Sequence, residues 1–384
     1  MNNLTMRTSN RPYETLRSWL ARSIVGQKYR ERRAARQLPK YHSSNAGNGP
    51  RSQKSVLFLC PATDRPHGGV KVIYKQAAII DDAAGPLAAK VLHPFDLQFK
   101  CSWFDNGATI KRELELDPSS DFVMIPEIWA VPHARLLSRL GVRYGIYVQG
   151  GYVMGACGSD AGDEHDEAYL NADLILAISD DTADCIKMAY PECTSKVHRV
   201  HHSISHEKFN AHPIKENVVC YMPRRLGKHS KLVMFLLKRK LPASWKIVSI
   251  DGLDENGVCD ILGRSKIFLS FSELEGWGMP PVEAALSGCQ IVGYTGEGGK
   301  EYWDTELFTE IHSGDIKSFV RTILNKVSEL DSFPAVSHAV AIENLADRYS
   351  ASNERASMRV VSEKILQILS LSRAPMSRVQ MRAA

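Results

Sequence analysis

The feature that most constrains the fold is a series of short segments that are apolar throughout, separated by stretches of helical pattern. Parallel strands covered by helices on both faces have this pattern, whereas strands with one exposed face alternate. A helix is expected over 70–80, and Ser179 can cap another over 180–189. The first half therefore predicts a doubly wound α/β domain. Its expected strands are "SVLFLC" (55–60), "AAKVLHP" (88–94), "DFVMIP" (121–126), "RYGIYV" (143–148) and "ADLILAIS" (172–179).

The second half of the chain repeats this alternation. Two Rossmann-like domains facing each other across a cleft are therefore expected, with ligands bound beyond the carboxyl ends of the strands. Strands are expected at 217–223, 246–252, 266–272 and 289–294, and helices at 231–240, 255–265, 281–287, 314–329 and 353–371. The loops expected to face the cleft are 61–69, 149–152, 222–228, 272–280 and 294–299.

These patterns divide the chain into five parts. The predicted parts are a basic leader and linker (1–54), a first Rossmann-like domain (55–212), a second Rossmann-like domain (213–345), a C-terminal helix packing back on the first domain (346–372) and a basic tail (373–384).

The charge of the chain is unevenly placed. Residues 1–54 hold 12 Lys and Arg against 2 Asp and Glu, while the rest holds 36 against 41. A mildly acidic body argues against nucleic-acid binding. Leu16, Leu20 and Ile24 lie on one face of an expected basic helix over 10–38, which suits an anionic membrane surface. A mobile leader, or a helix docked on its own body, remains the alternative.

Several classes of protein are excluded by simple patterns. No apolar run reaches the roughly 18–20 residues of a membrane span, and no apolar stretch follows the basic N-terminus as in a signal peptide. The eight cysteines are scattered without metal-ligand spacing, which favours reduced thiols. A cytoplasmic protein is expected, with contact to the inner face of the membrane as an open question. The acidic stretch 158–167 is interpreted as a loop and helix start rather than a metal site.

The most informative motif is "SELEGWGMPPVEAALSGCQIVGYTGEGGKEYW" (272–303). Pro281 suits the first turn of a helix, which places Glu283 in that turn and Glu275 in the loop before it. Carboxylates accept hydrogen bonds from vicinal hydroxyls, and Gly276 and Gly278 let the backbone approach a ligand. Paired carboxylates also serve glycosidases, but that chemistry needs no phosphate-binding loop.

The second loop of the motif suits phosphate. Thr295 offers a hydroxyl, and Gly298 and Gly299 leave N–H groups exposed before another expected helix start. One loop thus offers carboxylates that accept hydrogen bonds from hydroxyls, and the next offers groups that donate hydrogen bonds to phosphate. A nucleotide sugar carries both hydroxyls and phosphates.

The stretch "EGWGMPPVE", followed by a strand and a glycine cluster, resembles the Glu-x7-Glu signature of the retaining glycosyltransferases of family 4. That resemblance is specific over 215–330, looser over 55–212, and absent from 1–54. It implies the GT-B fold, a nucleotide-sugar donor and no required metal or other cofactor. It also implies that 55–212 is the acceptor-side domain and 213–345 the nucleotide-sugar domain.

The resemblance also implies roles for individual residues. Glu275 would contact the donor sugar and Glu283 the ribose hydroxyls, while Arg224 with Lys228 or Lys231 would hold the diphosphate. Fixed cations there would stabilise the charge of the departing diphosphate. Further donor contacts are assigned to Gly276, Trp277, Gly278, Thr295, Gly298 and Gly299, and either donor or acceptor contacts to Gly68 and Gly69.

One position departs from the family pattern. Gln149 stands where many members have a histidine, and an amide can hydrogen-bond a sugar but cannot exchange a proton. We expect Gln149 to position donor or acceptor.

A glycosyltransferase acting on a saccharide or lipid-linked acceptor, in cell-surface polysaccharide or glycolipid synthesis, is therefore the leading hypothesis. A nucleotide-sugar epimerase of the same fold and an inactive sugar-binding protein are the alternatives. A nicotinamide oxidoreductase is disfavoured because "GEGG" lacks the full glycine pattern.

Overall fold

The computed structural model describes residues 38–43, 53–224, 226–303, 306–332 and 338–371. The chain divides into two compact units, residues 1–41 and 42–384. The helix expected at 10–38 and the tail at 373–384 lie outside the described residues, apart from Leu38. All features below belong to the second unit.

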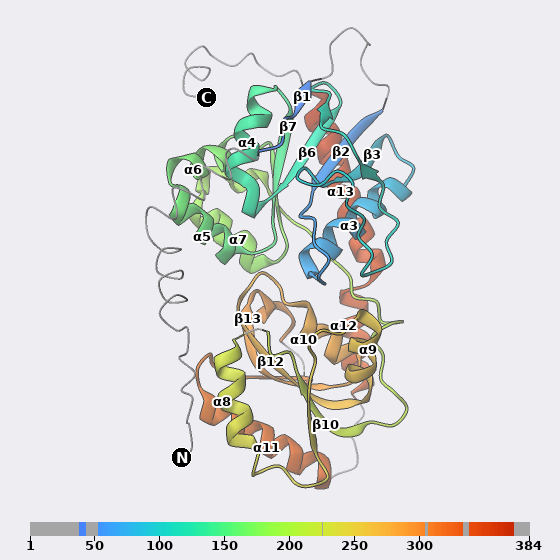
Figure 1. Cartoon of the computed structure of the whole chain (residues 1–384), viewed down its shortest axis with the longest axis vertical. Coiled ribbons are helices and arrows are strands. Elements are labelled where there is room, and N and C mark those ends of the chain that lie inside the picture. The colour runs from blue at the N-terminus through green and yellow to red at the C-terminus, as the bar shows by residue number, and fades with distance from the viewer. Residues whose placement is uncertain (1–37, 44–52, 225, 304–305, 333–337, 372–384) are drawn as a thin grey trace, which may run out of the picture. The chain divides into compact units, whose positions relative to one another are not determined.

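The first sheet has seven parallel strands among the described residues, in the order β4-β3-β2-β6-β7-β8-β9 (Figure 1). A further short pair joins β1 (His42–Ser43) to β5 (Glu115–Leu116). The strands are β2 (Lys54–Leu59), β3 (Leu87–Leu92), β4 (Ile110–Lys111), β6 (Asp121–Pro126), β7 (Arg143–Val148), β8 (Leu174–Ala177) and β9 (Val197–Arg199).

Helices connect most of these strands, as is usual for parallel pairing, whereas segments without a helix lead from β3 through β4 and β5 to β6. α3 packs on β3, α4 on β6 and β7, and α7 on β8 and β9, and α4 to α7 lie together in Figure 1. The helical segments are α3 (Gly68–Asp82), η2 (Glu127–Trp129), α4 (Ala130–Arg139), α5 (Gly151–Ala161), α6 (Asp163–Leu170), α7 (Asp180–Ala189) and η3 (Pro191–Lys196).

The second sheet has five parallel strands in the described ranges, in the order β11-β10-β12-β13-β14. The strands are β10 (Glu216–Tyr221), β11 (Lys246–Ser249), β12 (Ser265–Glu275), β13 (Gln290–Glu297) and β14 (Phe308–Glu310). The helical segments are α8 (Gly227–Leu237), α9 (Glu255–Arg264), α10 (Met279–Leu286), η4 (Gly298–Tyr302), α11 (Ile316–Ser332) and α12 (Ala339–Arg348).

Each sheet is packed as its apolar strands require. Val56, Phe58 and Met124 of the first sheet and Leu269 and Val292 of the second are at most 1% exposed. Burial of these runs on both faces supplies the main driving force for both folds.

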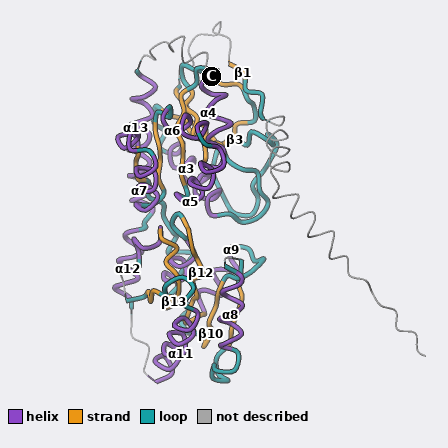
Figure 2. The backbone as a smooth tube through the Cα atoms, turned by 90° about the vertical axis from the view of Figure 1, so that its left-hand side faces the viewer, coloured by secondary structure: helices purple, strands orange, loops and turns teal. Residues whose placement is uncertain are grey.

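The last helix, α13 (Ala351–Ser370), returns to the first sheet, where it packs on α3, β2 and β6 (Figures 1 and 2). Lys54 donates to Ser370 Oγ at 2.8 Å, and Arg143 donates to the Leu371 carbonyl at 2.7 Å. The predicted fold class, two doubly wound α/β sheets, is confirmed.

The structure corrects several expected element boundaries. The first helix begins at Gly68 rather than at residue 70, and β12 runs on to Glu275, beyond the expected end at 272. Part of the acidic stretch 158–167 is helical in α5 and α6. α4, α5 and α12 were not predicted. α5 is rich in glycine and small residues, which lowers its helical signal. No helix in the described ranges is both long and apolar enough to cross a membrane.

Candidate functional site

The loops at the carboxyl ends of strands in both sheets meet at Gly276. A Cβ atom on Gly276 would overlap the carbonyl oxygen of Gln149, and one on Gly298 would overlap the carbonyl oxygen of Gly276. A Cβ on Gly69 would overlap the Gln149 side chain, whose amide donates to the Gly69 carbonyl at 3.2 Å. A Cβ on Gly68 would lie 3.1 Å from the sulfur of Met279. The backbones of three loops therefore meet at this point, and the Gly68–Gly69 loop contacts them through the side chains of Gln149 and Met279.

Glu275 is the last residue of β12, so the strand itself carries it to this junction. Its register partner in β13 is Glu297, after a register shift that follows Ser272. A Cβ on Gly296 would lie 3.1 Å from the Glu275 Cβ, so the glutamate side chain starts over the end of β13. Glu275 is half-buried and lies at the sheet edge where α/β folds bind ligands.

Glu283 lies in the middle of α10 and is 9% exposed. No hydrogen bond to its carboxylate occurs among the described residues. Burial raises the pKa of Glu283 to about 7, opposed by Lys71 and reinforced by Glu255. Glu275 is not among the charges that shift this pKa. A buried carboxyl without an internal hydrogen-bond donor is ready to accept one from a ligand.

An ionic cluster next to Glu283 joins the two sheets. Lys71 of α3 and Lys208 both bind Glu255 at the start of α9, Lys208 at 2.8 Å. Burial acts to raise the pKa of Glu255, but the hydrogen bonds from Lys208 and Lys71 outweigh it and hold the pKa below its usual value. Sequence reasoning missed this cluster, because its members lie far apart in the chain.

The three predicted diphosphate cations lie at the start of α8. Arg224 is exposed in the turn after β10, and Lys228 and Lys231 are exposed on the helix. His229 bonds the Tyr294 hydroxyl at 3.1 Å, which holds the start of α8 against the end of β13. The three cations therefore lie at the carboxyl edge of the second sheet. It shows no contact between their described side chains and the glycine junction.

The side chain of Trp277 does not face a ligand site. Its indole is 3% exposed, meets the His202 ring edge-on at 4.0 Å between centroids, and packs on Tyr302 and Tyr349. Its N–H donates to Glu301 at 2.6 Å. We therefore correct the expectation that this side chain binds donor, since protein atoms cover the ring.

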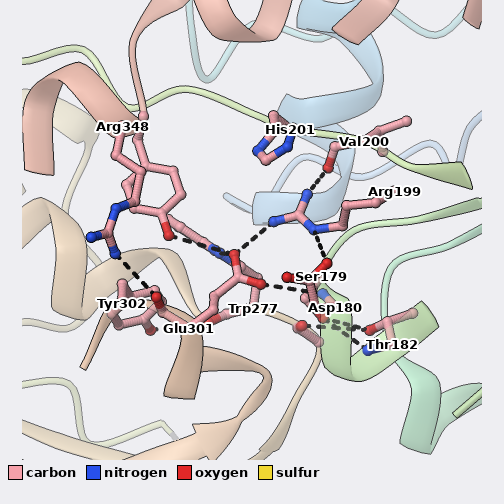
Figure 3. A network of polar contacts seen from close by, with 12 residues as sticks. Ser179, Asp180, Thr182, Arg199, Val200, His201, Trp277, Glu301, Tyr302 and Arg348 are labelled. Carbon is pink, nitrogen blue, oxygen red and sulfur yellow. Dashed lines mark hydrogen bonds and ion pairs between the residues drawn. The ribbon is translucent and has the colours of Figure 1, made fainter. Parts of the chain in front are cut away.

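Glu301 is the centre of a polar network that connects both sheets (Figure 3). Its carboxylate accepts from Arg199 at 2.6 Å and from the backbone N–H of Asp180 at 3.2 Å, in addition to Trp277. Arg348 donates to the Glu301 carbonyl at 3.1 Å. The network fixes Trp277, and with it the loop from Glu275 to Gly278.

The second predicted loop differs from expectation. Thr295 is 5% exposed within β13, and the expected helix start at Gly298 and Gly299 is only the five-residue segment η4. One such turn has little dipole, so the argument for phosphate from a helix N-terminus does not apply here. A pocket of about 480 Å³ lies elsewhere, along α8, and one of about 150 Å³ borders Thr295. The smaller volume is below the ~300 Å³ of ordinary ligand sites.

Glu127 is a further buried carboxyl at a strand end, and the sequence analysis did not single it out. It is 7% exposed directly after β6. Burial raises its pKa to about 7, against the opposing effect of backbone N–H groups of Glu127, Gln149 and Gly150. The carboxylate therefore supports the loop that carries Gln149. An acidic residue directly after a fully apolar strand was the available signal.

Comparison with solved structures identifies the architecture. HepE from Anabaena, in complex with UDP, superposes with a TM-score of 0.60 at 11% identity, over 82% of this chain and 100% of that one. Sucrose-phosphate synthase from Thermosynechococcus elongatus superposes with a TM-score of 0.57 at 10% identity, over 82% of this chain and 100% of that one. The catalytic domain of starch synthase IV from Arabidopsis thaliana, bound to ADP and acarbose, superposes with a TM-score of 0.55 at 10% identity. The superposition covers 84% of this chain and 100% of that one.

The chain has the GT-B fold. No protein-family model matches it. The GT-B chain is 38% identical over 53 residues to an α-1,6-glucosyltransferase of Actinobacillus pleuropneumoniae serotype 7 (strain AP76). That match spans 14% of this chain and 16% of the relative. Within the described ranges of this GT-B chain, no group of three or more His, Cys, Asp or Glu side chains could hold a metal ion.

Proposed function

We propose that this GT-B chain is a retaining glycosyltransferase of the family 4 type, which moves a sugar from a nucleotide-sugar donor to a saccharide or lipid-linked saccharide acceptor. The observation that carries the proposal is the junction at Gly276, where backbone from both sheets meets beside Glu275. A reaction between two sugars needs acceptor and donor held together, and each sheet can supply one side. The UDP in the HepE structure makes uridine nucleotides the first donors to test.

The proposed chemistry uses residues at the edge of the second sheet. Glu275 binds hydroxyls of the donor sugar, and Glu283 binds the ribose hydroxyls through its buried carboxylate. The bond between the anomeric carbon and the β-phosphate oxygen breaks, and the acceptor oxygen bonds to that carbon on the same face. The acceptor proton passes to the departing phosphate oxygen. Arg224, with Lys228 or Lys231, stabilises the charge of the diphosphate.

Residues of the first sheet complete the proposed site. Gly68 and Gly69 allow close approach of the donor phosphates or of the acceptor, and Gln149 donates to a sugar hydroxyl. The remaining donor contacts are the backbone of Gly276, Gly278, Gly298 and Gly299 and the hydroxyl of Thr295. No metal or organic cofactor is required in this scheme.

The proposed setting is the synthesis of a cell-surface polysaccharide or glycolipid at the inner face of a membrane. It is supported by the family resemblance and by the basic charge of residues 1–54.

The first experiment is a thermal-shift panel of UDP, GDP, dTDP and ADP sugars. A ligand at 100 times its Kd stabilises the folded protein by roughly 2.7 kcal/mol, so the correct base should stand out. A protein that no nucleotide sugar stabilises would contradict a donor site.

The second experiment tests the mechanism. Glu275→Ala should remove transfer of the identified donor sugar, while the exposed neighbour Glu273→Ala should retain it. NMR of the product should show the anomeric configuration of the donor. Conversion of the donor to an epimer without an acceptor would instead identify the epimerase, and donor binding without any product would identify a sugar-binding protein.

A further inference from the structure

The outward face of α8 exposes apolar side chains that nothing in the proposed reaction uses. Phe235 is 76% exposed, Leu232 52% and Leu236 38%, and their spacing of three and four residues puts them on one face of the helix. The opposite face carries Val233 and Leu237, which are completely buried against the second sheet. α8 is therefore apolar on both faces, although only one of them packs on described protein.

Cations surround this apolar face. Lys228 and Lys231 are exposed on the same helix, and Lys238, Arg239 and Lys240 are exposed in the turn after it. The segment 227–240 contains no Asp or Glu. An exposed Phe and two Leu within a ring of Lys and Arg is the pattern of a helix that lies in the headgroup region of an anionic bilayer.

The elements packed beside α8 do not neutralise this charge. α11 packs beside α8 (Figure 1). Two acidic side chains near the end of α11 already have partners: Glu329 pairs with Lys326 at 3.1 Å, and Asp331 accepts from the Trp245 indole at 3.0 Å. The cations Lys238, Arg239 and Lys240, which have no role in the proposed reaction, therefore remain available to an external anion.

We propose that the outward face of α8 (Leu232, Phe235 and Leu236), with the basic turn Lys238–Lys240, docks on an anionic lipid surface. This surface is distinct from the leader at 1–54, and the inference does not depend on the proposed reaction. Lipid is favoured over a protein partner because the charge of the segment 227–240 is of one sign and lies on both sides of the apolar residues in the sequence. Docking would bring the second sheet against the membrane.

The experiment measures sedimentation of the full-length protein with vesicles of phosphatidylcholine alone and of phosphatidylcholine mixed equally with phosphatidylglycerol. Binding is expected only to the anionic vesicles and should weaken with salt. Phe235→Ser should reduce the partition coefficient by about tenfold or more, because a large apolar side chain is lost from the bilayer boundary. Met188→Ser is the control, since Met188 is 82% exposed and lies on α7, away from this face.

A second pair of variants tests the charge. Lys238→Glu with Lys240→Glu should weaken binding by about 25-fold or more, at about fivefold for each cation removed. Arg355→Glu with Arg359→Glu makes the same charge change on exposed positions of α13 and should have a much smaller effect. Unchanged melting temperatures establish that the variants fold.

Three outcomes would overturn the proposal. The first is wild-type vesicle binding by both α8 variants, which would assign any binding to the leader. The second is an equal loss of vesicle binding in the α13 double variant, which would mean that only the net charge of the protein matters. The third is an absence of binding by the wild-type chain to anionic vesicles.

Discussion

Gly276 has no room for a side chain, and this restriction arises from the backbone of another sheet rather than from its own conformation. The atoms that a Cβ would meet are the carbonyl carbon and oxygen of Gln149 and the α-carbon of Gly150. Backbone atoms cannot rotate away as a flexible side chain can. A substitution at this position must therefore move one loop relative to the other.

We predict that Gly276→Ala destabilises the protein by about 1–3 kcal/mol and abolishes transfer. The added methyl would separate the loops that hold Glu275 and Gln149. Gly155→Ala is the matched control, because Gly155 is exposed in α5 and its Cβ would meet nothing within 4 Å. That change should stabilise by about 0.5–1 kcal/mol through helix propensity. Equal melting temperatures and activities for the two variants would refute the close contact.

The pKa of Glu283 gives a second prediction at this scale. Burial raises it from the usual 4.5 to about 7. Between these values the folded state holds a proton that the unfolded state has lost, so this carboxyl lowers stability as the pH rises through that range. Glu283→Gln stays neutral. Relative to wild type, the variant should therefore gain stability from about pH 5 to about pH 8, by up to about 3 kcal/mol.

Denaturant titrations of both proteins across this pH range provide the measurement. Glu127 titrates over the same range but is present in both proteins, so the difference isolates Glu283. A constant difference between the two proteins would show that Glu283 has an ordinary pKa. In the same series, Glu283→Gln should weaken nucleotide-sugar binding, since the amide replaces a carboxylate that accepts from both ribose hydroxyls.

At the scale of elements, the sequence predicted the sheets well because their strands are apolar throughout and each is followed by a turn signal. Ser179 caps α7 as expected, accepting from the Thr182 N–H at 3.0 Å. The errors fall where local pattern and tertiary contact disagree. α10 begins at Met279 before its two prolines, and η4 takes the place of an expected longer helix.

The candidate site was predictable only in part. Glu275, Glu283 and the glycines were visible as a motif within 32 residues of sequence. Glu301 belongs to the same stretch, but its role could not be predicted from the sequence. Its partners Arg199, Asp180 and Arg348 come from distant segments. Trp277 was assigned to the donor site because it lies in the stretch that resembles the family signature. No nearby sequence pattern indicated that His202, Tyr302 and Tyr349 would cover the Trp277 ring.

The pair of Arg199 and Glu301 should couple η4 to the first sheet. Both side chains are about 15% exposed, and Glu301 also accepts the Trp277 indole N–H. We predict a coupling energy of about 1–3 kcal/mol in a double-mutant cycle of Arg199→Ala and Glu301→Ala. Glu301→Gln retains an acceptor for Trp277 and should recover part of the stability and of kcat. A coupling energy near zero would mean that the two residues act independently.

At the scale of the whole second unit, α13 follows the second sheet in sequence but packs on the first. Its Glu354 is completely buried, pairs with Lys75 at 3.0 Å and accepts from Ser203 at 2.8 Å. Ser203 lies in the segment between the two sheets, so Glu354 joins the helix, α3 and this segment. We expect both sheets to unfold in one transition.

We predict that Glu354→Ala costs about 3–5 kcal/mol, because it leaves buried partners without their carboxylate. Glu354→Gln should cost less, since an amide oxygen can still accept from Ser203. Glu363→Ala, at an exposed position of the same helix, should change stability by at most about 0.5 kcal/mol. Calorimetry of the three variants gives the comparison, and separate transitions for the two sheets would contradict the bridging role.

The contact at Gly276 also bears on how relatives of this chain can differ. At position 149 the contact involves the main-chain carbonyl oxygen, which every amino acid has. At position 276 it requires a residue without a side chain, and only glycine meets that requirement. Substitution at 149 therefore leaves the contact intact, whereas substitution at 276 does not. Homologous chains should keep glycine at 276 while position 149 exchanges between glutamine and histidine, so that acceptor chemistry can diverge without rebuilding the junction.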